Sequence, residues 1–358
     1  MTAFYVGFTS RKARFLSQFI HQPVRPLRGH SLVLPGDVIY AWGDHPVPPQ
    51  QANGVPVIRV EDGFVRSVGL GAAFAQPLSW VFDSRGLHHW GHQHTDIEDL
   101  ITNCTGDDVL LGRAAALRAL ILSHQITKYN LPAASGALLP PRTEERARVL
   151  VVGQVSDDAA LRGIQSPIKS NMALLEAVRR NRPKAEVIYR PHPDVVVGIR
   201  QGNDEAWSSF ADLRACSGSI EQLFGEIDEV HVMNSLAGFE AILRDIPVVT
   251  YAQPFYAGWG LTSDVHPPAR RYPRTLDQVV AAALIRYPKY RHPDTGSPID
   301  VETAVELLAG MRSSKRDESL VQRMRSWLTL GFAKLADRIR LARAGEGKRT
   351  IQADSTNA

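Results

Sequence analysis

At 358 residues, the chain is long enough for two domains of ordinary size, each with its own hydrophobic core. Its 44% hydrophobic and 22% charged residues are typical of a soluble globular protein, and a net charge of only +4, spread along the chain, argues against a nucleic-acid partner. Two cysteines without CxxC spacing argue against a disulfide scaffold or a cysteine zinc site, and no window reaches the ~20 apolar residues of a membrane span.

The amino-terminal residues contain no charged segment followed by a long apolar run, so we expect no signal peptide and a cytoplasmic location. In the first half, apolar runs alternate with helical patterns, which is typical of a parallel α/β fold. Strands are predicted at 3–8, 37–43 and 55–60, and helices at 11–20 and 113–125. The third of these strands runs into Glu61-Asp62-Gly63, which places two carboxylates at its carboxyl end.

A segment rich in proline, glycine and serine, 131–148, separates two such patterns. After it, strands are predicted at 148–153, 185–190, 230–233 and 248–251, and helices at 171–181, 220–227, 236–244, 275–285 and 301–308. We therefore predict α/β domains at 1–145 and 146–312, followed at 313–358 by a basic amphipathic helix and a polar tail. The helical pattern at 315–343 fits a helix on an anionic membrane and a helix packed on the globule equally well.

Polar residues follow three predicted strands of the second half, at 154–158, 190–194 and 234–235. The carboxyl ends of parallel strands meet at one edge of a sheet, where phosphate and nucleotide ligands bind. Arg190, His192 and Ser235, with a helix N-terminus, therefore predict a site for an anion or a nucleotide phosphate. The loop 254–260, in which aromatic residues alternate with glycines, is expected to cover that site.

Several chemistries lack their motif in this sequence. There is no P-loop, G-x-G-x-x-G or G-x-S-x-G, which argues against kinase, dehydrogenase and α/β-hydrolase activity, and no D-x-D for a metal–diphosphate. The histidines at 88, 89, 92 and 94 lack the spacing of a metal site, so we expect a surface or cleft loop and neither metal nor cofactor. A nucleotide site with carboxylates on both sides of a cleft suggests glycosyl transfer, in which one carboxylate can act as nucleophile and another group as acid/base.

Seven segments resemble, in the same order, the capsule polysaccharide β-Kdo transferases of the KpsC type. They are Glu61–Gly71, Ile126–Asn130, Gly153–Asp158, Arg190–Asp194, Ser235–Glu240, Pro254–Thr262, and Thr275–Asp277 with Ala281–Pro288. The resemblance implies two Rossmann-like domains facing a cleft in a GT-B-like arrangement. It implies transfer of Kdo from CMP-β-Kdo, with retention by double displacement, to a Kdo-terminated glycolipid acceptor in capsule or related surface polysaccharide synthesis. Capsule assembly proteins and the inner-membrane surface, with the protein bound peripherally, are further implied partners.

The resemblance also assigns roles to individual residues. The pattern Gln154-x-x-x-Asp158 makes Asp158, rather than Asp157, the nucleophile. Glu61, with Asp62 as second candidate, is the acid/base group. The substrate-binding residues are Gln154 and Asp157, His192 and Ser235 for the CMP phosphate, Lys169 and Arg190 near the sugar carboxylate, and Glu240 for the ribose or for anchoring the loop.

Two features depart from the family pattern. Its members often contain two such modules in tandem, whereas one is present here, which implies a single linkage. Leu87-His88-His89-Trp90 replaces a Tyr-Tyr-Asp-like segment, which bears on acceptor recognition. Two other functions stay open: a CMP-sialic-acid-type transferase, since both sugars are 2-keto acids, and a non-catalytic CMP-binding subunit of a capsule assembly complex.

Overall fold

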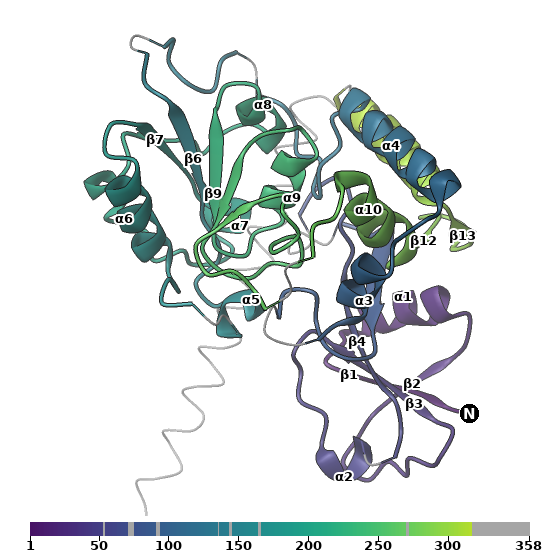
Figure 1. The fold of residues 1–358 in the computed structure, drawn as a ribbon. Helices are drawn as coiled ribbons and strands as arrows, with labels where there is room; N and C mark the ends of the chain where they lie inside the picture. The colour runs from purple at the N-terminus through teal and green to yellow at the C-terminus, as the bar shows by residue number, and fades with distance from the viewer. Residues whose placement is uncertain are drawn as a thin grey trace, which may run out of the picture. The chain divides into compact units, whose positions relative to one another are not determined.

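The computed structural model describes residues 1–52, 54–70, 75–90, 94–134, 136–142, 145–163, 166–269 and 272–316. The chain divides into two compact units, Met1–Ala309 and Gly310–Ala358. Within the first unit, two sheets with flanking helices form a mixed α/β fold (Figure 1). The predicted tail helix at 315–343 lies, from residue 317 onward, outside the described residues.

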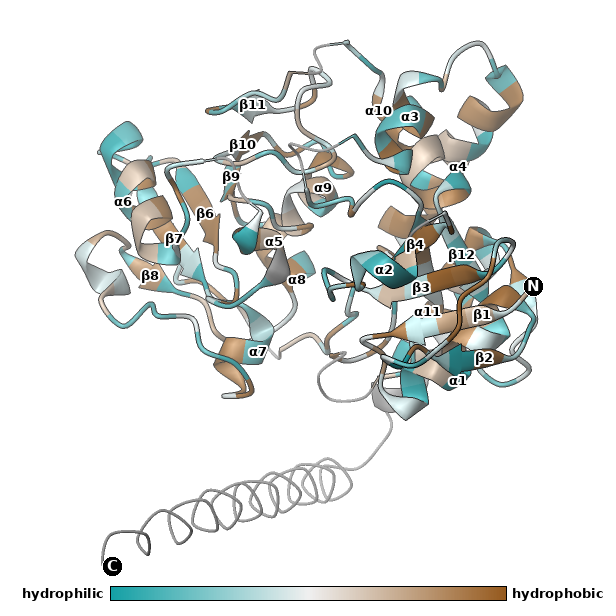
Figure 2. Cartoon of the chain, turned by 90° about the horizontal axis from the view of Figure 1, so that it is seen from below, coloured by the Kyte–Doolittle hydropathy of each residue, from teal (hydrophilic) through white to brown (hydrophobic). Residues whose placement is uncertain are grey.

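The second sheet is parallel throughout its six described strands, as predicted. In spatial order these are β11 (Ser263–Asp264), β10 (Val248–Thr250), β9 (Glu229–Val232), β6 (Arg148–Val152), β7 (Glu186–Arg190) and β8 (Leu213–Arg214). Every residue of β6 is buried, and Figure 2 shows this strand as largely hydrophobic, as expected for a strand covered on both faces. The strand order reverses at β6, so the crevice between the carboxyl ends of β6 and β9 is a topological switch point, where α/β proteins bind ligands.

The helices beside this sheet are mostly short. They are α5 (Ala159–Arg162), α6 (Asn171–Asn181), α7 (Pro193–Val196), the 3₁₀ turn η2 (Trp207–Ser209), α8 (Ile220–Phe224) and α9 (Ala237–Ile242). The longest, α6, begins where the Ser170 hydroxyl accepts a hydrogen bond from the Ala173 N–H at 3.2 Å. Its buried residues Leu174, Leu175 and Val178 pack on the sheet core.

The first sheet is mixed, whereas the sequence pattern predicts a parallel one. Its seven described strands are, in spatial order, β13 (Pro298–Ile299), β12 (Pro288–Arg291), β5 (Ser79–Asp83), β4 (Val57–Asp62), β3 (Val38–Trp42), β1 (Ala3–Val6) and β2 (Val24–Pro26). The strands β1 to β4 pair in parallel, but β5 is antiparallel to β4 and β12 is antiparallel to β5. A parallel pair needs a crossover element, and the described residues between β4 and β5 contain no helix that could provide one.

The chain returns to the first sheet after the second sheet is complete. The strands β12 and β13, which lie within the range predicted for the second domain, extend the first sheet. The helix α10 (Leu276–Val280) and the π-helix η3 (Ala281–Arg286) pack against α3 (Asp96–Thr102) and α4 (Asp108–Ser123). The other helices of this part are α1 (Ser10–Ile20), α2 (Pro49–Ala52) and α11 (Val301–Arg316). The boundary between residues 145 and 146 stays a prediction.

The core of the first sheet is an aromatic cluster around Trp80, a residue of β5 with no exposed surface. Its indole stacks on Phe19 with ring centroids 4.8 Å apart and meets Trp42 edge-on at 5.1 Å. The indole Nε1–H donates a hydrogen bond to Asp62 at 3.2 Å. The core therefore also fixes the carboxyl end of β4, where the predicted acid/base residues lie.

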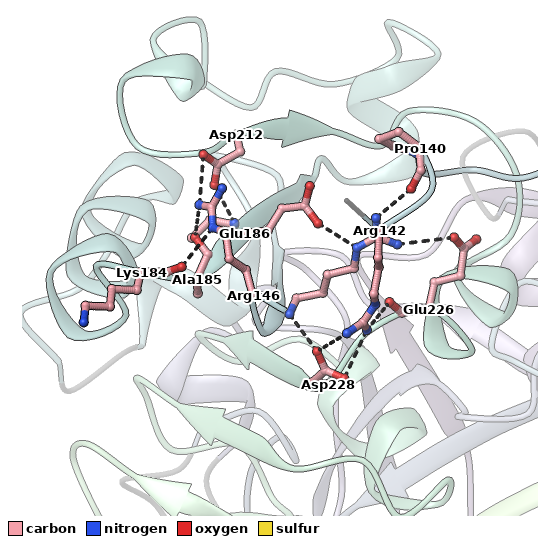
Figure 3. Close-up of polar contacts among 11 residues, drawn as sticks. Pro140, Arg142, Arg146, Lys184, Ala185, Glu186, Asp212, Glu226 and Asp228 are labelled. Carbon is pink, nitrogen blue, oxygen red and sulfur yellow. Dashed lines mark hydrogen bonds and ion pairs between the residues drawn. The ribbon is translucent and has the colours of Figure 1, made fainter. Parts of the chain in front are cut away.

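An arginine network holds the amino end of β6 (Figure 3). Arg148 is 3% exposed, and it bonds Glu186 at 2.6 Å and the Pro140 carbonyl at 2.6 Å. Its backbone N–H donates to Asp228 at 2.7 Å, and Asp228 also pairs with Arg142 at 3.1 Å. These contacts tie the segment that precedes β6 to residues beside β7 and β9.

Replacing Arg148 by Met is expected to lower the free energy of unfolding by about 2–4 kcal/mol, because Glu186 and the Pro140 carbonyl lose a buried cationic partner. The matched control is Arg142→Met, in the same network but 42% exposed, which should cost less than about 1 kcal/mol. Urea denaturation of both variants, followed by circular dichroism, measures the difference. Equal losses of stability would contradict the buried role of Arg148.

Candidate active site

A cavity of about 220 Å³ lies at the carboxyl edge of the second sheet. One wall comes from the ends of β6, β7 and β9, and the other from the end of β4 and from the segments 88–89 and 127–131. Most of the predicted site residues line it, namely Glu61, Asp62, Gln154, Asp158, Arg190, His192, Ser235 and Glu240. Asp157 and Lys169 do not: both are exposed, and Asp157 pairs with Arg200 at 2.5 Å.

Gln154 joins the ends of β6 and β9 across the switch point. Its backbone N–H donates to Asn171 at 2.8 Å, and its side-chain Oε1 accepts from the Asn234 backbone N–H at 2.9 Å. Gly153 before it has no room for a side chain, because a Cβ there would lie 2.5 Å from the Tyr189 hydroxyl. With Oε1 fixed, the Gln154 amide nitrogen, which donates no hydrogen bond to the described residues, is available to a ligand in the cavity.

Asp158 caps the amino end of α5. One of its carboxylate oxygens accepts from the Ala160 N–H at 3.0 Å, which leaves the other oxygen for chemistry. His89 lies close enough for the Asp158 charge to act on it. Burial nonetheless lowers the pKa of His89 to about 4, against the opposing effect of Asp158, so the imidazole is neutral near pH 7.

His192 and Ser235 are uncharged hydrogen-bonding groups on the same side of the cavity. The His192 Nδ1 accepts from the Asp194 N–H at 3.1 Å, so the ring proton is on Nε2. Burial lowers the pKa of His192, in spite of the Asp194 and Asp158 charges. The Ser235 Oγ accepts from the Ala237 N–H at 3.3 Å, which orients the hydroxyl so that it can donate elsewhere.

The structure gives Arg190 and Lys169, the basic residues predicted to lie near the sugar carboxylate, surroundings that differ from this prediction. Arg190 is 5% exposed, and both terminal nitrogens of its guanidinium are engaged by backbone carbonyls, those of Ala215 at 2.9 Å, Ser217 at 2.6 Å and Gly218 at 2.6 Å. It therefore holds the loop before α8 in place at the edge of the cavity. Lys169 is exposed and lies outside the cavity lining.

Sequence reasoning gave no role to Lys128 or Tyr129, and it placed His88 and His89 in a surface or cleft loop that bears on acceptor recognition. All four residues line the cavity. The segment 126–130 belongs to the resemblance, but it has no periodic pattern from which a side-chain direction could be predicted. The Lys128 backbone N–H donates to Glu240 Oε1 at 2.6 Å. Glu240 thus holds the 126–130 loop, while its predicted role at the ribose or in anchoring the loop beside the site stays a prediction.

The two carboxylates at the end of β4 differ in their surroundings. Burial and the neighbouring Asp62 charge raise the pKa of Glu61 to about 7, against the opposing charges of Lys12 and Lys128. Asp62 instead pairs with Arg66 at 2.8 Å and accepts from the Trp80 indole at 3.2 Å. Glu61 is therefore the member of the pair that is free to exchange a proton near neutral pH.

Within the described part of the chain, no three His, Cys, Asp or Glu side chains are grouped as a metal ion would require. His94 is exposed and pairs with Asp99 at 2.6 Å, while His92 lies outside the described residues. None of the described helices combines the length and the apolar character that crossing a membrane demands.

The solved structures similar to this chain include two from KpsC of Thermosulfurimonas dismutans. The β-Kdo 2,7 transferase is 30% identical with a TM-score of 0.72, and the match covers 87% of this chain and 100% of that one. The β-Kdo 2,4 transferase is 28% identical with a TM-score of 0.72, and the match covers 87% of this chain and 98% of that one.

Two curated relatives are longer proteins. The capsule polysaccharide modification protein LipA of Neisseria meningitidis serogroup B is 39% identical over 291 residues, which are 80% of this chain and 41% of LipA. The lipopolysaccharide-processing protein LpsZ of Rhizobium meliloti is 38% identical over 263 residues, which are 72% of this chain and 59% of LpsZ. The chain therefore spans about two fifths of the length of LipA.

A family model described as capsule polysaccharide biosynthesis protein matches residues 45–290, a range that contains all the residues predicted for the site. Together with the two KpsC structures, this match confirms the resemblance predicted from the seven ordered segments. The chain belongs to the family of capsule polysaccharide biosynthesis proteins.

Proposed function

We propose that the chain is a retaining glycosyltransferase, which moves Kdo from CMP-β-Kdo to a Kdo-terminated, lipid-linked acceptor. The observation that carries this proposal is the cavity itself, to which the second sheet contributes Asp158 and the first sheet contributes Glu61. A cleft between two α/β halves, with a ligand site at a switch point, is what a GT-B-like enzyme requires. The similarity to two β-Kdo transferases supports the choice of sugar. Capsule assembly proteins and the inner-membrane surface remain predicted partners.

In this proposal, the nucleotide lies against the second sheet. The Nε2–H of His192 and the hydroxyl of Ser235 donate hydrogen bonds to the CMP phosphate, and the Gln154 amide contacts the bound donor. Hydrogen-bond donors suit this task, because negative charge develops on the phosphate as CMP leaves.

The reaction proceeds in two displacements at the anomeric carbon. The free carboxylate oxygen of Asp158 attacks this carbon as its bond to the CMP phosphate oxygen breaks, which gives CMP and a sugar covalently bound to Asp158. The acceptor hydroxyl then attacks the same carbon, its proton passes to the Glu61 carboxylate, and the bond to Asp158 breaks. Two inversions give net retention.

Asp158→Asn is expected to reduce transfer from CMP-Kdo by at least about 1,000-fold, because an amide oxygen is a poor nucleophile. The fold should survive, since Asn keeps a side-chain oxygen that can accept from the Ala160 N–H. Asp157→Asn is the matched control: this neighbour is exposed and outside the cavity, so activity should change less than about threefold. Mass spectrometry of the wild-type protein with donor alone should show a Kdo adduct on Asp158. Full activity of Asp158→Asn would contradict the assignment.

The transfer rate should rise with pH through about 7, as Glu61 loses its proton and becomes the base that accepts the acceptor proton. Glu61→Gln should abolish this rise and lower the rate by about 100-fold or more. Rate measurements between pH 5.5 and 8.5 at saturating donor and acceptor, an interval of about three pH units around the Glu61 pKa, test this. A rise that persists unchanged in Glu61→Gln would assign the base to another group.

The same assays separate the alternative functions. Turnover with CMP-sialic acid but not with CMP-Kdo would favour the sialyltransferase-type enzyme. Binding of CMP without turnover on any Kdo-terminated acceptor would favour a non-catalytic subunit.

A further inference from the structure

Lys128 sits on a loop whose backbone is fixed at several points. Thr127 and Asn130 exchange hydrogen bonds at 3.0 and 3.2 Å, and the Asn130 side chain donates to the Ser67 carbonyl at 3.0 Å. The Lys128 N–H itself is held by Glu240. The loop therefore presents the Lys128 side chain to the cavity from a backbone that has little freedom to move.

The ammonium group of Lys128 has no hydrogen bond or ion pair with the described residues. Its Nζ lies 5.4 Å from the centre of the Tyr129 ring, a weak cation–π contact. Burial disfavours its charge, but Tyr129, Asp62 and Glu61 outweigh burial and raise the pKa of Lys128, so the group is charged at neutral pH. A charged group in a cavity without a close counter-ion is poised to bind an anion.

The charge of Lys128 acts on both walls of the cavity. It opposes protonation of His89 and of His192, and the same two rings also feel the charge of Asp158. Lys128 and Asp158 both line this cavity, Lys128 from the 127–131 segment and Asp158 from the segment that follows β6, and the carbon attacked by Asp158 must lie in it. In a 2-keto sugar acid that carbon carries a carboxylate, so the carboxylate is one bond from the reacting atom.

We propose that Lys128 binds the carboxylate of the donor sugar, and that it thereby selects a 2-keto sugar acid over a neutral sugar. This inference rests on the proposed function. The predicted candidates for this task have other roles or positions, since Arg190 is engaged by backbone carbonyls and Lys169 is outside the cavity. The ammonium group also reduces the repulsion between the Asp158 carboxylate and the sugar carboxylate as the two anions approach.

The test uses Lys128→Met, which removes the charge but keeps most of the side-chain volume, with Lys169→Met as the matched control. The KM for CMP-Kdo should rise about tenfold or more in Lys128→Met. The acceptor KM, and the Kd for CMP measured by calorimetry, should stay within about twofold, because neither depends on the donor carboxylate. Lys128→Arg should recover part of the loss, and Lys169→Met should match the wild type.

Different results would overturn the inference in distinguishable ways. A loss of CMP affinity as large as the rise in KM would assign Lys128 to the phosphate, and a rise in the acceptor KM alone would assign it to the acceptor. Unchanged kinetics in Lys128→Met would remove Lys128 from substrate binding while leaving the proposed function intact. No transfer by the wild-type protein would overturn the proposed function, and this inference with it. Thermal melting checks folding, and Lys128→Gln replaces the Met variant if that variant does not fold.

Discussion

The geometry of the site depends on Asn234, which joins three segments that are remote in sequence. Its backbone N–H bonds Gln154 at 2.9 Å, so the ends of β9 and β6 are held together, and its side-chain nitrogen donates to the His89 carbonyl at 2.8 Å. Because His89 belongs to the other wall, one buried residue sets how the two walls meet. Hydrogen bonds made by a buried polar residue of this kind are costly to break. The exposed pair of Arg162 with Asp44, at 2.6 Å, is a second link, which joins the end of α5 to the residues that follow β3.

The adjacent carboxylates of Glu61 and Asp62 have different surroundings. Asp62 forms an ion pair with Arg66 and accepts a hydrogen bond from Trp80, so its position is fixed and it places a negative charge beside Glu61. That charge and burial together raise the pKa of Glu61. When two neighbouring carboxyl groups have different environments, their pKa values differ, and one of them can transfer protons near pH 7. Gly43 takes part as well, because a Cβ at this position would lie 2.8 Å from the Glu61 carboxylate.

The sequence predicted well those features that follow from a single strand. A continuous apolar run specified β6, and the polar residues that follow β6, β7 and β9 were expected to share one edge, which they do at the cavity. The sequence could not predict the hydrogen-bond partners of a long side chain. Arg190, for example, donates to backbone carbonyls up to 28 residues away in sequence. Nor could it predict that β12 would return to pair with β5, because short strands lack a periodic pattern. Lys128 was missed because the surroundings of a long side chain follow only from the fold, which shows what lies around its ammonium group.

The environments of the lining groups also determine how the cavity responds to pH. His88, His89 and His192 all have lowered pKa values, so these rings stay neutral as the pH falls from 8 toward the ordinary histidine range. Lys128 has a raised pKa and stays charged over the same interval. The pKa of Glu61, about 7, lies within this interval. In the proposed mechanism, proton transfer to Glu61 would therefore depend on pH over an interval in which the charges of the three rings and of Lys128 stay constant.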